Sequence, residues 1–102
     1  MYKGLRKSIE TNDGITHSEA FWRIVEVRLD AVNEKANIQL VAYHSEDAFD
    51  NGKNNIGVAR DVTVSPVDLT DIDTMRDLTD AMYAKVKNID ADFTDAELVE
   101  SK

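Results

Sequence analysis

The chain has 102 residues, of which 42% are hydrophobic and 31% charged, and it contains no cysteine. This length suits one domain, and the lack of cysteine excludes disulfides and thiolate metal sites. Residues 1–35 carry six basic and six acidic side chains, whereas residues 36–102 carry six and fourteen. The net charge of −8 therefore lies after residue 35, and such a surface repels the phosphates of DNA and RNA.

The first third of the chain carries strand and turn signals. Apolar and polar side chains alternate over residues 5–10, which is the period of a half-buried strand. Asn12-Asp13-Gly14 tolerates positive φ and predicts a tight hairpin turn. The strand predicted over 20–29 is apolar on both faces in its first half. Either it is a central strand covered on both sides, or a bulge near Ile24 and Val25 exchanges its faces.

The middle of the chain predicts two further strands. Asp30–Lys35 is polar enough for a connecting turn, and Asn37–Ser45 has the alternation of the next strand. Ser45–Asn55 combines low apolar content with turn residues and is predicted as a loop. Ile56–Val64 then alternates as a one-sided strand.

Helix signals follow Ser65-Pro66, because proline interrupts both a strand ladder and the helical conformation of the residue before it. A long helix is predicted next, capped by Asp68 or Thr70. Its apolar stripe recurs every three or four residues and consists of Ile72, Met75, Leu78, Met82 and Val86. Thr94 and Glu97 have the spacing of a capping box, which predicts a short second helix over 94–99.

These elements predict an α+β fold in a single domain over residues 1–102. We expect an antiparallel sheet of about four strands, because the loops between them are short. One long C-terminal helix should pack on one face of this sheet, followed by a short terminal helix.

Two similar strings, His17-Ser18-Glu19-Ala20 and His44-Ser45-Glu46-Asp47-Ala48, invite a hydrolase interpretation. Neighbouring side chains of an extended chain point to opposite faces, so His44 is not placed to act as a base for Ser45. A pairing of His17 with Ser45 is conceivable, but the sequence has no Gly-x-Ser-x-Gly nucleophile elbow. We therefore expect no enzyme activity, no catalytic residue, no cofactor and no metal ligand.

Two arginines, Arg23 and Arg60, fall on apolar positions of their strands. An unpaired buried guanidinium costs several kcal/mol, so each is expected near a sheet edge, where it reaches solvent or an Asp. The alternative is an ion pair with another subunit.

Four apolar and aromatic residues form a candidate interface: Trp22, Ile24, Val41 and Tyr43. If the long helix covers the side of Phe21, Val25 and Leu40, these four would form a patch on the other side. Large exposed apolar patches usually mark protein contacts. The alternative is that another segment of the same chain covers them.

Much of the chain resembles an uncharacterised family of small proteins encoded by tailed phages and prophages. The family reads roughly Leu-Lys-Lys-Ser-Ile-Glu, then Gly-Ile or Gly-Val, then Ala-Tyr-His-Arg-Ile. The matching segments here are Leu5-Arg6-Lys7-Ser8-Ile9-Glu10, Gly14-Ile15, Ala20-Phe21-Trp22-Arg23-Ile24, 38–48 and 81–96. Trp22 stands where the family tends to have His, so any chemistry of that His is missing from this chain. The resemblance implies a virion or tail component, or an assembly accessory.

The sequence therefore predicts a non-catalytic phage or prophage protein that acts through protein–protein contacts. Its expected partners are copies of itself, in a homo-oligomer, or other phage proteins, with no nucleic acid and no membrane. Its expected location is the host cytoplasm, and the phage particle if it is a virion component. The alternative function is an acidic, host-directed inhibitor or DNA mimic, based on the charge after residue 35.

Overall fold

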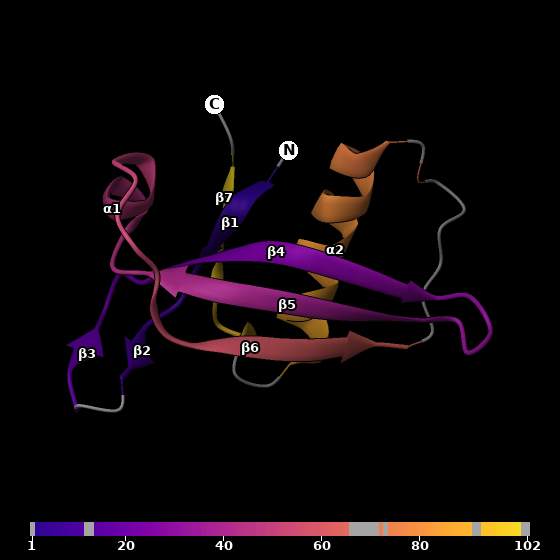
Figure 1. Cartoon of the computed structure of the whole chain (residues 1–102), viewed down its shortest axis with the longest axis horizontal. Coiled ribbons are helices and arrows are strands. Elements are labelled where there is room, and N and C mark those ends of the chain that lie inside the picture. Colours follow the sequence, from indigo (N-terminus) through magenta and orange to yellow (C-terminus); the bar gives the residue numbers. More distant parts are fainter. Residues whose placement is uncertain (1, 12–13, 66–71, 73, 91–92, 101–102) are drawn as a thin grey trace.

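The computed structural model describes residues 2–11, 14–65, 72, 74–90 and 93–100. The elements in these residues are β1 (Tyr2–Arg6), β2 (Ile9–Glu10), β3 (Thr16–His17), β4 (Phe21–Asp30), β5 (Lys35–Tyr43), α1 (Glu46–Asp50), β6 (Ile56–Val64), α2 (Met75–Ile89) and β7 (Glu97–Glu100). Five of the strands form an antiparallel sheet in the order β6-β5-β4-β1-β7, and β2 pairs separately with β3 (Figure 1). The predicted α+β class with an antiparallel sheet is confirmed.

The expectation of about four strands and a C-terminal helix was wrong at the two ends of the chain. Residues 5–10 divide between β1 and β2, which belong to different sheets. The segment predicted as a terminal helix contains most of β7, which pairs with β1 and places Leu98 opposite Leu5. An unpaired strand edge leaves amides and carbonyls without partners, and satisfying them outweighs the local capping signal. The long helix is therefore followed by a strand.

The predicted hairpin near residue 14 is present as the β2–β3 pair, with Ile9 opposite His17. Gly14 has a φ of 82°, which glycine adopts without strain. Asn12 and Asp13 of the predicted turn lie outside the described residues.

Helix α2 begins later than predicted. The Thr74 hydroxyl accepts a hydrogen bond from the Asp77 amide at 3.1 Å, so Thr74 is the N-cap. The expected caps, Asp68 and Thr70, lie outside the described residues. Of the predicted apolar stripe, Met82 and Val86 are buried, whereas Met75 is exposed. Within the part of the chain that the structure describes, neither helix is both long and apolar enough to cross a membrane.

A bulge in β4 exchanges the faces of that strand, as one of the two sequence interpretations required. The pairing of β4 with β5 shifts between Ile24 and Glu26, which leaves Val25 as the extra residue. Ile24 before the bulge and Val27 after it both pack against the core. Glu26 and Arg28 consequently alternate onto the other side of the sheet.

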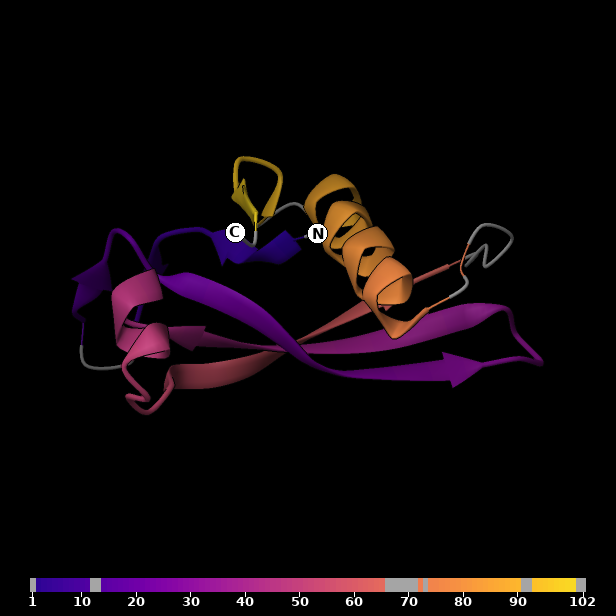
Figure 2. The ribbon, with the colours of Figure 1, turned by 90° about the horizontal axis from the view of Figure 1, so that it is seen from above.

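The core lies between α2 and the face of the sheet that α2 covers. Figure 2 shows α2 on one side of β4, β5 and β6, with the opposite side uncovered by the drawn elements along most of its length. The largest fully buried side chains of this core are Leu5, Ile38, Leu40, Val64, Met82, Tyr83, Val86 and Phe93, while Phe21 is fully buried on the other face of the sheet. Burial of this kind stabilises a fold by roughly 1.5–3 kcal/mol for each large apolar side chain.

Tyr83 of α2 joins β1 to β4 at the point where their direct pairing stops. Those strands pair through Leu5 with Trp22 and Arg6 with Phe21. One step further, the Tyr83 hydroxyl accepts a hydrogen bond from the Ile24 amide at 2.9 Å and donates one to the Lys3 carbonyl at 3.3 Å. Tyr83 is completely buried. Its hydroxyl therefore satisfies the hydrogen-bonding needs of two backbone groups inside the protein.

Gly4 permits the close approach of β1 to β4. A Cβ atom at this position would lie 2.5 Å from the Trp22 carbonyl oxygen and 2.6 Å from a ring carbon of Phe21. Any larger residue would push the two strands apart and break the Tyr83 bridge between them.

We expect Tyr83→Phe to lower the free energy of unfolding by about 1–3 kcal/mol, because it leaves the Ile24 amide and the Lys3 carbonyl unsatisfied. Urea unfolding followed by circular dichroism measures this change. Tyr43→Phe is the matched control, since no hydrogen bond of its hydroxyl is found within the described residues. Equal stability of the two variants would show that the bridge is not needed.

Candidate functional site

The four residues of the predicted interface lie on two different faces of the sheet. Trp22 is opposite Ala42 and Ile24 is opposite Leu40, and residues directly opposite each other share a face. Ala42 and Leu40 belong to the buried core to which α2 contributes, so Trp22 and Ile24 are on the core face. Val41 and Tyr43 alternate with these residues and point to the open face. The four residues therefore do not form a single patch, and for Trp22 the alternative of cover within the same chain holds.

Trp22 belongs to the core of the chain. Only 6% of its surface is exposed, and its ring packs edge-on against Phe93 with the centroids 5.2 Å apart. Its indole nitrogen donates a hydrogen bond to the Lys7 carbonyl at 3.1 Å. The polar end of the side chain is thus satisfied inside the monomer.

An aromatic cluster occupies the end of the open face nearest α1. It is defined by Phe21, Arg23, Val41, Tyr43 and Phe49. Phe49 of α1 lies 5.0 Å from Tyr43 and 5.7 Å from Phe21, measured between ring centroids. Phe21 is fully buried, whereas Val41, Tyr43 and Phe49 are each partly exposed. This cluster combines apolar area with polar groups in the way that protein interfaces do.

Sequence reasoning missed Phe49 because residues 45–55 were predicted as a loop. The structure contains α1 there, and the Ser45 hydroxyl caps it by accepting a hydrogen bond from the Ala48 amide at 3.1 Å. The signal was present, since Ser45 precedes two acidic residues in the first helical turn.

Ion pairs fix the position of α1 and hence of Phe49. The Lys3 ammonium lies 2.7 Å from the Asp50 carboxylate and 3.0 Å from that of Glu46. Hydrogen bonds to Asp50 and Glu46 raise the pKa of Lys3 above its usual range. Arg6 contacts Glu46 as well, at 3.5 Å. Strand β1 therefore holds α1 in place through two basic side chains.

The two arginines have different environments. Arg60 lies on the edge strand β6 and its guanidinium donates to both carboxylate oxygens of Asp90 at 3.0 and 3.1 Å, which confirms the expected partner. Arg23 lies on β4, which is not an edge strand. Its guanidinium stacks over the Phe49 ring at 4.5 Å, and its buried Nε has no hydrogen-bond partner within the described residues. The expected edge position of Arg23 was wrong.

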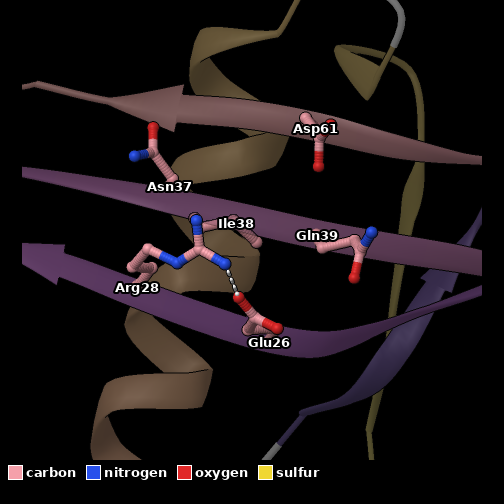
Figure 3. A pocket seen from close by; sticks show the side chains of 6 residues that line it. All are labelled: Glu26, Arg28, Asn37, Ile38, Gln39 and Asp61. Atoms are coloured by element: carbon pink, nitrogen blue, oxygen red, sulfur yellow. Dashed lines mark hydrogen bonds and ion pairs between the residues drawn. The ribbon is translucent and has the colours of Figure 1, made fainter.

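Beyond the aromatic cluster, the open face of β4, β5 and β6 contains a depression with a polar lining. A depression of about 450 Å³ is lined by Glu26, Arg28, Asn37, Ile38, Gln39 and Asp61. Figure 3 shows the five polar side chains on the near side of β4, β5 and β6, with α2 behind the sheet. Arg28 and Glu26 form an ion pair at 2.7 Å. The lining offers donors and acceptors for hydrogen bonds but no hydroxyl, thiol or amine nucleophile.

The two histidines of the sequence come together away from this face. His17 of β3 and His44 after β5 place their Nδ1 atoms 2.8 Å apart, and their rings meet edge-on with centroids 4.9 Å apart. Ser45 is engaged as the cap of α1. Among the described residues, no three His, Asp or Glu side chains gather closely enough to hold a metal ion.

Comparison of the chain with protein-family models, with curated proteins and with solved structures finds no match in any of the three.

Trp22→Ala should lower the free energy of unfolding by about 3–5 kcal/mol, because it removes a buried aromatic side chain from the core. Chemical denaturation combined with light scattering distinguishes this from a role between subunits. A stable, folded monomer derived from a wild-type oligomer would instead identify Trp22 as an interface residue.

Proposed function

We propose that this protein is a non-catalytic binding protein whose open sheet face contacts another protein. The observation that carries the proposal is that the partly exposed side chains of the aromatic cluster adjoin the polar hollow, on the face of the sheet opposite α2. Within the cluster Arg23 pairs with Val41 across the strands, and the next pair on the same face of β4 and β5, Glu26 with Gln39, lines the hollow. Aromatic residues and arginine contribute most to protein interfaces, and polar groups around them provide specificity.

The chemistry of the hollow fits a protein partner better than a nucleic acid. It contains the carboxylates of Glu26 and Asp61 against the single cation of Arg28. Those carboxylates repel phosphates, while the amides of Asn37 and Gln39 pair readily with backbone groups of a partner. Exposed polar side chains on β4, β5 and β6 can therefore guide a partner onto the aromatic cluster.

The proposed setting is a tailed phage or prophage. The family resemblance of residues 5–29 and 81–96 supports an accessory component of the virion or tail, present in the host cytoplasm before assembly. The proposed partners are other phage proteins or further copies of this chain. The second candidate, an acidic inhibitor of a host DNA-binding protein, is supported by the net charge of −8.

A matched pair of asparagine substitutions tests the open face. Asn37 lines the hollow, and Asn88 is an exposed residue of α2. We expect Asn37→Lys to reduce incorporation into purified phage particles by about tenfold or more, equivalent to roughly 1.4 kcal/mol of contact energy. Asn88→Lys should leave incorporation unchanged. Quantitative mass spectrometry of the particles measures both.

Equal stability of the two variants must accompany this result, so that the loss reflects contact and not folding. Absence of the wild-type chain from particles and assembly intermediates would contradict a virion role. Competition by DNA for a host partner would then favour the acidic inhibitor.

A further inference from the structure

The His17–His44 pair is independent of the open face and joins two separate parts of the chain. His17 belongs to the β2–β3 hairpin, and His44 follows the last residue of β5. Each β strand of that hairpin has only two residues, and an isolated two-stranded hairpin is marginally stable. The contact between the rings therefore ties a weakly supported hairpin to the main sheet.

A hydrogen bond joins the two imidazoles. At a separation of 2.8 Å, one Nδ1 carries hydrogen and donates, and the other Nδ1 accepts through its lone pair. The accepting ring then carries its own hydrogen on Nε2. Both ring nitrogens that face each other are thus nitrogens that can bind a metal ion.

The separation of these nitrogens is that of a hydrogen bond, in which the accepting lone pair points at the other ring. Metal–nitrogen bonds of imidazole are about 2.0–2.1 Å long, so one metal ion between the rings needs only a small increase in their separation. His17 is partly buried and His44 is exposed, so the rings can turn until both lone pairs converge.

We propose that His17 and His44 form a two-histidine site for a divalent transition metal, with Cu²⁺ as the best match and Ni²⁺ next. Imidazole suits both ions, and Cu²⁺ binds most tightly among the divalent first-row metals. The protein supplies two ligands and water completes the coordination. The bound metal clamps the hairpin to the end of β5 and stabilises the folded chain, since the unfolded chain does not hold the two rings together.

Metal binding does not change the number of hydrogens on the two rings. The ring that donates through Nδ1 moves its hydrogen to Nε2, and both Nδ1 lone pairs then bind the metal. No proton leaves the protein when both rings start neutral.

The composition of the chain makes the test specific. It has two histidines and no cysteine, so a metal bound through two imidazoles has to lie at this pair. Titration of the metal-free protein with Cu²⁺, followed by calorimetry and electron paramagnetic resonance, should show one ion per chain coupled to two imidazole nitrogens. His17→Gln and His44→Gln should each leave one coupled nitrogen and weaken binding by about tenfold or more, because the second ligand no longer binds intramolecularly.

Two controls separate this site from general attraction to the acidic surface. Mg²⁺ prefers oxygen ligands and should not raise the melting temperature, whereas Cu²⁺ should raise that of the wild type and not of the single variants. Equal Cu²⁺ affinity of the wild type and both variants would overturn the proposal. A wild-type spectrum with fewer than two coupled imidazole nitrogens would do so without any variant.

Discussion

The hydroxyl of Tyr83 lies between β1 and β4, at a point where the two strands would otherwise form a direct hydrogen bond. The arrangement of the sheet depends on this hydroxyl. It replaces the direct contact between the Ile24 amide and the Lys3 carbonyl, so β1 and β4 stay joined while they diverge. The same side chain belongs to α2, which is thereby positioned over the covered face. Gly4 makes the close approach sterically possible on β1. One buried polar atom thus relates three elements that are far apart in sequence.

The β4 bulge lies just beyond this bridge and determines what the open face presents. Val25 is the extra residue, and after it Glu26 and Arg28 occupy the face that Phe21 and Arg23 occupy before it. An apolar and aromatic region and a polar region consequently follow each other along one strand. This succession is what allows one uncovered surface to combine binding energy with hydrogen-bond specificity.

Local patterns predicted those parts of the fold that depend on local chemistry. The strand over 20–29, the turn after Asp30 and the strand over 56–64 all follow from alternation and turn residues. The local patterns failed where the secondary structure of a segment depends on residues that are distant in sequence. Residues 97–100 form a strand because β1 needs a neighbour, and no local signal carries that information.

The candidate sites show the same division. Alternation alone cannot say which parity of a strand a helix covers, so the sequence left open whether Trp22 is covered within the chain. Phe49 and Arg23 meet only because α1 folds back over β4. His17 and His44 were conspicuous as repeated strings, but their contact requires a hairpin to bring together residues 27 positions apart.

The pairing of β1 with β7 also sets the order in which the sheet is assembled. Tyr2 lies opposite Glu100, so the earliest strand of the described chain has one of its neighbours near the end of that chain. The β4–β5–β6 meander needs only short loops and can form while the later residues are still in the ribosome tunnel. The outer side of β1 has to wait, with its amides and carbonyls in water, until β7 emerges. Closure of this side of the sheet therefore joins two segments that are far apart in sequence, and it costs more loop entropy than formation of the meander.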